Sequence, residues 1–228
     1  MRKVFLVILV LNLVSCKSQV KKKENTSEKN NTMEYFDISK YKVLEVDDKY
    51  SSSGKDLYLK DDKLRIKILY LNDVIQIEET SIENKFQLIK VFFESNKSLK
   101  IVGSKFYNFS IGKWEYYDEK GQLIKEINYD LDYKLTINDL AKNMKDKYNL
   151  DIMDVKKTDN VNRYIDSQKT KLPLYEIYYN DNTQIGILNC YVINGNTGDV
   201  LFKTTRLAET EEKQGSLYQK FIESYDKK

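Results

Sequence analysis

Short runs of β-branched and aromatic residues, separated by polar turns, fill the chain from residue 35 to residue 132. Such runs at close spacing, with no stretch of helical periodicity between them, predict an antiparallel sheet built as a meander. Several runs alternate as Arg65-Ile66-Lys67-Ile68 does, which gives the strand one apolar face and one charged face. The expected strands are residues 41–46, 57–60, 64–71, 74–80, 86–94, 99–106, 113–117 and 123–129.

The periodicity changes after residue 133. Apolar positions in residues 134–149 recur at helical spacing, and Thr136 with Asp139 forms a capping box, so we expect an amphipathic helix there. Further strands are expected at residues 152–156, 174–180, 185–193 and 199–205, the last two joined by a turn at 194–198. A final helix is expected on Leu217, Tyr218, Phe221, Ile222 and Tyr225. The predicted fold class is α+β: an antiparallel meander of hairpins, a small helix-plus-antiparallel-sheet module and a C-terminal helix.

The first sixteen residues carry an export pattern. Arg2 and Lys3 precede an apolar run at residues 4–14, and Ser15 stands directly before Cys16. A basic head, a short apolar stretch and a small residue before the cleavage point are typical of a secretory signal peptide. The run is too short for a bilayer core, which needs roughly 20 apolar residues. We therefore expect residues 1–15 to be removed on export.

Leu13, Ser15 and Cys16 resemble the cleavage site of bacterial lipoproteins. The resemblance implies that Cys16 becomes the mature N-terminus and carries lipid, which would tie the chain to a bilayer. It also implies a place in the bacterial cell envelope, at the outer membrane if the envelope has one, with the globular part outside the cytoplasm. The alternative is a cytosolic protein with an apolar start.

The composition of the following segment suggests the domain organisation. Residues 16–33 hold almost nothing that can be buried, so they are expected to form a flexible linker behind the lipidated cysteine. Residues 34–133 are then the expected β domain, and residues 134–228 the expected α+β module with the C-terminal helix.

Charge and residue usage narrow the function classes. Lysine and arginine (38) are interleaved with aspartate and glutamate (35), which argues against a nucleic-acid partner because phosphate binding needs a concentrated basic face. Histidine is absent, which removes the usual general base and the commonest metal ligand. Cys190 lies in an apolar run and is expected to be a small buried side chain. We expect no metal and no cofactor.

Residues 112–126, Gly-Lys-Trp-Glu-Tyr-Tyr-Asp-Glu-Lys-Gly-Gln-Leu-Ile-Lys-Glu, resemble a MORN-type repeat of the YwqK antitoxin-like family. Each such unit is a β-hairpin with Asp-x-x-Gly as its turn. A weaker copy begins at Phe92-Phe93, offset by 24 residues, with Lys97 where the turn glycine would stand. The resemblance covers residues 88–130 and implies stacked hairpins and an antitoxin-like or immunity role.

A second resemblance covers residues 134–206. Their order of helix, strands and closing hairpin, with Thr197-Gly198-Asp199 in the last turn, is similar to the PepSY type of small envelope domain. This resemblance implies an alternative function, the modulation of an envelope peptidase.

Candidate catalytic residues are few. Carboxylate doublets occur at Asp47-Asp48, Asp61-Asp62 and Glu78-Glu79. Neighbouring residues of a strand point to opposite faces, so these doublets are poor catalytic pairs. An enzyme that uses a carboxylate pair is a third alternative, and we expect the chain not to be an enzyme.

The candidate binding residues are the aromatic residues Phe93, Trp114, Tyr116 and Tyr117. Consecutive aromatic residues on a strand place one ring on each face, and exposed aromatic rings mark interfaces. A second layer such as the C-terminal helix could instead cover these rings, and the sequence leaves both possibilities open. The leading hypothesis is a membrane-anchored envelope lipoprotein that binds a protein or peptide partner without catalysis.

Overall fold

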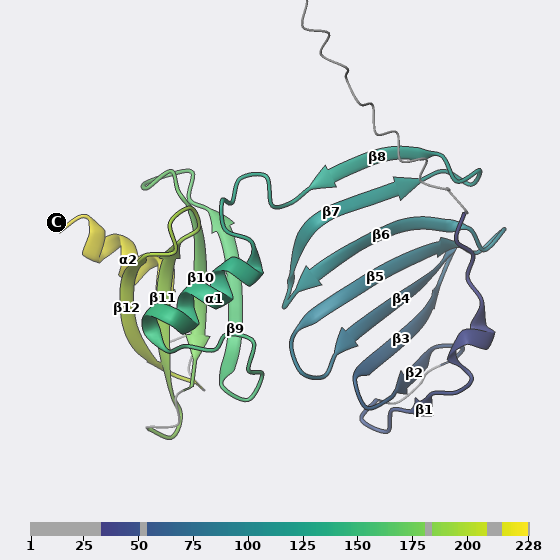
Figure 1. The fold of residues 1–228 in the computed structure, drawn as a ribbon, viewed down its shortest axis with the longest axis horizontal. Helices are drawn as coiled ribbons and strands as arrows, with labels where there is room; N and C mark the ends of the chain where they lie inside the picture. Colours follow the sequence, from purple (N-terminus) through teal and green to yellow (C-terminus); the bar gives the residue numbers. More distant parts are fainter. Residues whose placement is uncertain (1–32, 51–53, 181–183, 209–215, 228) are drawn as a thin grey trace, which may run out of the picture. The chain divides into compact units, whose positions relative to one another are not determined.

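Two antiparallel sheets and two α-helices form the described part of the chain (Figure 1). The computed structural model describes residues 33–50, 54–180, 184–208 and 216–227. One sheet has eight strands in sequence order, which is the expected meander, and the other has four strands in the order β12-β11-β10-β9. The predicted α+β class is confirmed. The expected signal peptide, Cys16 and residues 17–32 of the expected linker lie outside the described ranges.

The first sheet consists of β1 (Glu45–Val46), β2 (Leu57–Lys60), β3 (Leu64–Leu71), β4 (Val74–Ser81), β5 (Phe86–Phe93), β6 (Leu99–Phe106), β7 (Phe109–Tyr117) and β8 (Leu123–Asn128). It is followed by α1 (Ile137–Tyr148) and then by the second sheet, which consists of β9 (Thr158–Ile165), β10 (Pro173–Tyr179), β11 (Ile187–Asn194) and β12 (Val200–Leu207). The last helix is α2 (Leu217–Tyr225), and a short 3-10 helix, η1 (Ile38–Tyr41), precedes the first sheet.

Alternation along the strands gives the eight-stranded sheet two unlike faces. We call the face that carries Ile66, Ile68, Ile77 and Phe92 the core face, because these side chains form one buried cluster there. The segment before β1 covers part of this face, and its Phe36 ring lies 5.8 Å from the ring of Phe92. We call the opposite face the outer face.

The two turns of the weak internal repeat have the same backbone conformation. Gly121, in the turn between β7 and β8, has a φ of 77°, and Lys97, 24 residues earlier between β5 and β6, has a φ of 62°. The left-handed region costs a residue with a Cβ atom about 1–2 kcal/mol. The turns also touch, because the Asn96 side-chain amide donates to the Glu119 carbonyl at 2.9 Å. The two turns thus place a residue in the left-handed region at corresponding positions, and they contact each other.

The second sheet lies between two helices, each on its own face. Helix α1 begins at the predicted capping box of Thr136 and Asp139 and ends at Asn149, whose φ is 56°. It buries Ile137, Leu140 and Met144 against the face of β10 that carries Tyr175 and Ile177. Helix α2 buries Leu217 and Phe221 against the other face of the sheet, next to Leu174, Cys190 and Val192.

One apolar cluster joins the two sheets. Phe106 and Tyr107, at the turn between β6 and β7, pack in the same buried cluster as Leu140 of α1 and Ile177 of β10. Beside the cluster, Arg163 of β9 donates to the Ser110 carbonyl of β7 and pairs with Asp130, which follows β8, at 2.7 Å. The expected boundary between residues 133 and 134 thus falls in the connection between β8 and α1, and the elements on its two sides share a core.

The strand predictions fail at three places. Residues 152–156 form turns rather than a strand, with Ile152 inserted into the core. Strand β9 was not predicted, because Val161 is the one buried aliphatic side chain in a run of polar residues. The expected strand at 41–46 is reduced to the two residues of β1, since the 3-10 helix Ile38–Tyr41 occupies its start.

Candidate functional site

Three of the four predicted aromatic residues share the outer face of the eight-stranded sheet. Tyr116 on β7 pairs with Ile101 on β6, and Ile101 pairs in turn with Val91 on β5. Trp114 lies two residues before Tyr116 and Phe93 two residues after Val91, so both point to the same side. All three rings are half-buried. We call the set Phe93, Ile101, Trp114 and Tyr116 the aromatic patch.

Tyr117 differs from the expectation. It follows Tyr116 directly on β7 and therefore points to the core face, where its hydroxyl donates to the Glu115 carboxylate at 2.5 Å. The pKa of Tyr117 is raised to about 12, mainly by burial and in addition by the hydrogen bond to Glu115. The alternation rule separates the two tyrosines, so Tyr117 does not belong to the aromatic patch.

A glycine positions the indole of Trp114. The ring lies flat on Gly103, where an added Cβ atom would come 2.1 Å from the ring carbon Cδ2. The indole Nε1 donates to the Ser104 carbonyl at 3.0 Å, and the Tyr129 ring packs edge-on at 6.0 Å between ring centroids. The β6–β7 pairing shifts register at this point, between Val102 and Ser104. The bulge and the absence of a Cβ atom at Gly103 together leave room for the indole.

Lysines accompany the rings of the patch. The ammonium of Lys100 lies 5.0 Å from the centroid of the Phe93 ring, and that of Lys125 lies 5.4 Å from the centroid of the Tyr116 ring. Lys105 lies two positions beyond Gly103 on the same side of β6. Within the described ranges, no ion pair engages these three lysines. The patch is therefore an aromatic surface with a positive rim.

The buried clusters of the described residues show which side of the first sheet they cover. Both clusters that include residues of this sheet gather on the core face or at the β6–β7 turn, as Phe92 and Phe106 illustrate. Among the described residues, none of the side chains in these clusters comes from the aromatic patch. Helix α2, which the sequence offered as a possible cover, packs on the second sheet.

The sequence did not single out several residues that complete the patch. Gly103 and Tyr129 hold Trp114, and Lys100, Lys105 and Lys125 supply the charge. The period-two alternation of β5 to β7 could have identified the lysines, because it places them beside the rings. The contact between Gly103 and Trp114 depends on a β-bulge that no local sequence motif predicts.

The carboxylate doublets do not converge. Asp47 is buried against Arg65 at 2.9 Å, whereas its neighbour Asp48 is exposed and pairs with Lys60 at 3.1 Å. Glu78 lies on the outer face beside Lys67, and Glu79 points to the core face. In the residues that the structure describes, no group of three His, Cys, Asp or Glu side chains is arranged to hold a metal ion.

Cys190 is fully buried between the second sheet and α2. Burial raises the pKa of its thiol to about 12, so the reactive thiolate is suppressed. Cys16 lies outside the described residues. In the described part of the chain, neither helix combines the length and the apolar character needed to cross a bilayer.

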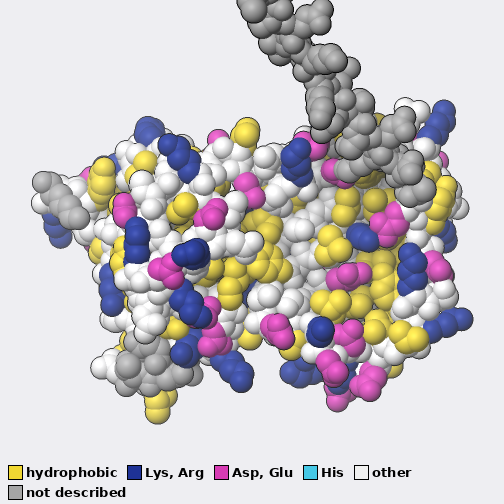
Figure 2. All heavy atoms as spheres, in the orientation of Figure 1, with side chains coloured by type: hydrophobic (Ala, Val, Ile, Leu, Met, Phe, Trp, Pro, Cys, Tyr) yellow, Lys and Arg dark blue, Asp and Glu magenta, His cyan; other side chains and the backbone are white. Residues whose placement is uncertain are grey.

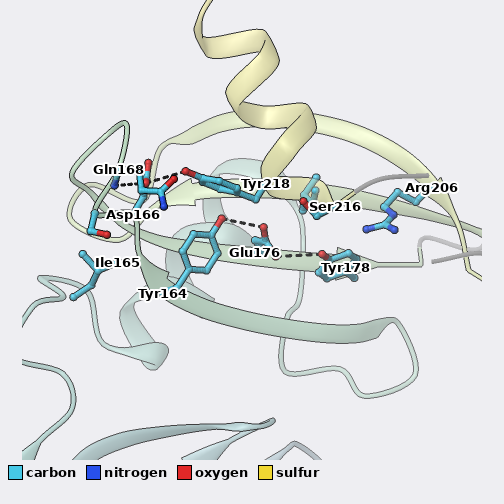
Figure 3. Close-up of a pocket in the computed structure, with 11 residues that line it drawn as sticks. Tyr164, Ile165, Asp166, Gln168, Glu176, Tyr178, Arg206, Ser216 and Tyr218 are labelled. Atoms are coloured by element: carbon cyan, nitrogen blue, oxygen red, sulfur yellow. Dashed lines mark hydrogen bonds between the residues drawn. The ribbon is translucent and has the colours of Figure 1, made fainter. Parts of the chain in front are cut away.

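The second sheet carries a separate cavity of about 720 Å³ beside α2 (Figure 3). Its walls include the buried side chains Glu176 and Arg206 and the rings of Tyr164, Tyr178 and Tyr218. On the face shown in Figure 2, side chains of both charges are interspersed, without a large region of one sign.

No family model, curated protein or solved structure matches the chain significantly.

Proposed function

We propose that the mature protein is a lipid-anchored lipoprotein of the bacterial cell envelope that binds a protein or peptide partner without catalysis. The lipid anchor at Cys16 and the envelope location are supported by the lipoprotein-like pattern of residues 1–16. The immunity or antitoxin-like form of this role is supported by the MORN-like hairpin at residues 112–126.

The observation that supports partner binding best is the aromatic patch. Three large rings lie on a sheet face to which the buried clusters of the described residues contribute no cover. Aromatic residues surrounded by polar side chains are typical of the centre of a protein interface. Because Lys100, Lys105 and Lys125 rim the patch, the partner is expected to present apolar side chains flanked by carboxylates.

Affinity capture with matched variants tests the proposal. The full-length chain, Trp114→Ala, Tyr116→Ala and Tyr117→Ala would each be purified in detergent and incubated with envelope extract. We expect the wild type and Tyr117→Ala to retain one stoichiometric partner, and the other two variants to lose it. Capture should also weaken as the salt concentration rises. Equal capture by all four proteins would contradict the proposal, and circular dichroism checks that each variant is folded.

The proposed anchor has its own test. Intact-mass analysis of the protein from its native membrane should show loss of residues 1–15 and addition of a diacylglycerol group. A thiol reagent should find no accessible cysteine in the native chain and one after denaturation, which is Cys190. An intact leader, or a free thiol at Cys16, would contradict the anchor.

A further inference from the structure

Three buried charged side chains line the cavity beside α2. Asp166 accepts hydrogen bonds from the N–H groups of its own loop and from the Tyr218 hydroxyl, whereas Glu176 and Arg206 carry opposite charges and do not pair. Glu176 on β10 is 7% exposed and Arg206 on β12 is 8% exposed, and both line the cavity. They lie on the same face of the second sheet. Glu176 is paired with Val192 of β11, and Arg206 is paired with Leu188 of β11. Val192 and Leu188 are four residues apart and therefore point to the same side of that strand. No ion pair joins Glu176 and Arg206, and in the described residues no other carboxylate pairs with Arg206. The space between them can therefore receive a ligand that carries both kinds of group.

Glu176 is held in place by its neighbours. Its two carboxylate oxygens accept hydrogen bonds from the Tyr164 hydroxyl at 3.0 Å and the Tyr178 hydroxyl at 3.2 Å (Figure 3). A carboxylate offers about four lone-pair sites, so two remain for a donor in the cavity. The two tyrosines fix the rotamer of Glu176 without neutralising its charge.

Arg206 is the complementary group. Its guanidinium extends into the cavity over the Tyr178 ring, with 5.9 Å between the guanidinium carbon and the ring centroid. The guanidinium carries five N–H donors in a planar fork that matches a carboxylate with two parallel hydrogen bonds. A buried charge that lacks such a partner carries a desolvation cost, and an incoming carboxylate would remove much of it.

The start of helix α2 faces the same cavity. Ser216 is the N-cap, and its hydroxyl accepts from the Gln219 N–H at 3.1 Å, while Leu217 and Tyr218 follow in the first turn. The first N–H groups of a helix point along its axis without intrahelical partners, and the helix dipole favours negative charge there. Figure 3 shows Ser216 between Glu176 and Arg206, on the side of the cavity where α2 begins. An anionic group is thus favoured at that side.

We propose that this cavity binds the free carboxylate end of an amino acid or peptide. The carboxylate lies between the Arg206 guanidinium and the first turn of α2, and the α-nitrogen of the same residue donates to Glu176. The cavity volume of about 720 Å³ falls in the range of roughly 300–1,000 Å³ that is usual for small-ligand sites. Tyr164 and Tyr218 supply apolar walls for the ligand side chain. The site is separate from the aromatic patch and does not depend on the partner proposed above.

Isothermal titration of the full-length chain tests the site with three probes: leucine, the tripeptide Ala-Ala-Leu as the free acid, and the same tripeptide with a C-terminal amide. We expect the free acid to bind at least tenfold more tightly than the amide. If leucine binds as well as the free-acid tripeptide, the ligand is an amino acid; if only the tripeptide binds, it is a peptide end. Equal binding of acid and amide, or no binding of either free acid at millimolar concentration, would overturn the proposal.

Variants locate the site. Arg206→Gln should weaken binding of the free acid at least tenfold, and Arg206→Lys should weaken it less because the charge remains. The matched control is Lys203→Gln, on the same strand but on the other face, where Lys203 lies over the Tyr191 ring. Unchanged affinity in a folded Arg206→Gln protein would overturn the proposal. Trp114→Ala should bind the probes normally, which distinguishes this site from the aromatic patch.

Discussion

The indole of Trp114 lies directly on Gly103, and no other residue type leaves room for it. A Cβ atom at position 103 would lie 2.1 Å from the ring carbon Cδ2, far inside van der Waals contact. The half-buried position of the ring, its hydrogen bond to the Ser104 carbonyl and its edge contact with Tyr129 all depend on this seat. The shape of the aromatic patch is therefore determined by a residue that has no side chain.

Gly103→Ala should displace the indole and destabilise the fold. Forcing extra volume into a packed site typically costs about 1–3 kcal/mol. We expect a loss of that size in urea unfolding, with a change in tryptophan fluorescence because Trp114 is the single tryptophan of the chain. Ser104→Ala is the matched control, since it keeps the backbone carbonyl that accepts from the indole. An unchanged fluorescence spectrum in Gly103→Ala would contradict the proposed seat.

Lys97→Gly should stabilise the protein. Lys97 has a φ of 62°, a conformation that glycine adopts without the steric cost of a Cβ atom. We expect a gain of about 1 kcal/mol in the free energy of unfolding, less the extra entropy that glycine gives the unfolded chain. Lys105→Gly, inside strand β6, should instead destabilise by about 0.5–1 kcal/mol. A stability loss of the same size in both variants would show that the turn at Lys97 is unstrained.

Arg163→Met should weaken the connection between the two sheets. The Arg163 side chain is 5% exposed, pairs with Asp130, and donates to the carbonyls of Ser110 and Tyr129. Removing one partner of a buried ion pair leaves the other charge unpaired and costs about 3–5 kcal/mol. We expect a loss below that range, because the Asp130 side chain is 26% exposed and keeps its bond from the Gly112 N–H.

The control for Arg163 is a pair of the same type on the surface. Lys113 and Glu126 lie 2.9 Å apart and are well exposed, so Lys113→Met should leave the stability nearly unchanged. Comparable losses in the two variants would contradict the bridging role of Arg163. Both are measured by chemical unfolding followed with circular dichroism.

Glu176 should make stability depend on pH in a defined direction. Burial raises the pKa of Glu176 above its ordinary value of 4.5, and the bonds from Tyr164 and Tyr178 oppose the shift only in part. A carboxyl group whose pKa is higher in the folded than in the unfolded chain stabilises the fold at a pH below its unfolded pKa. This stabilisation is lost as the pH rises through the pKa of the folded state. Glu176→Gln should therefore gain stability relative to the wild type as the pH rises above 4.5.

Asp166 supplies the comparison of opposite sign. Burial opposes the shift, but the N–H groups of Thr170, Lys169 and Gln168 lower the pKa of Asp166 well below its ordinary value. Its contribution is present above the unfolded pKa and is lost as the pH falls. Asp166→Asn should thus lose the most stability at neutral pH and progressively less in acid. The same pH trend in both variants would contradict these assignments.

Local patterns predicted the eight-stranded meander, α1 with its capping box, and α2, because each depends on periodicity or on turn residues close in sequence. Strand β9 was missed because it has only one buried aliphatic residue, Val161, and because the partners of its Arg163, which are Asp130 and the carbonyls of Ser110 and Tyr129, are remote in sequence. The cavity of Glu176 and Arg206 was missed for the same reason, since these two residues come from strands β10 and β12.

For the aromatic patch, the sequence predicted which residues supply the rings. It predicted only in part on which face of the sheet each ring lies. Alternation along β7 places Tyr116 and Tyr117 on opposite faces, but the side that is covered depends on where Phe36 and α1 pack. That information lies in tertiary contacts rather than in any one segment. The sequence could therefore suggest the aromatic residues of the patch but not the residues that surround it.

The central claim is that a partner binds on the outer face of the first sheet, and site-specific photo-crosslinking in the native envelope tests it most directly. Lys125 and Glu126 are adjacent and exposed on β8, with Lys125 on the aromatic side beside Tyr116 and Glu126 on the opposite side. A photoreactive residue at position 125 should give one discrete protein adduct, and the same residue at position 126 should give none. Adducts of equal yield from both positions, or none from position 125, would contradict the claim.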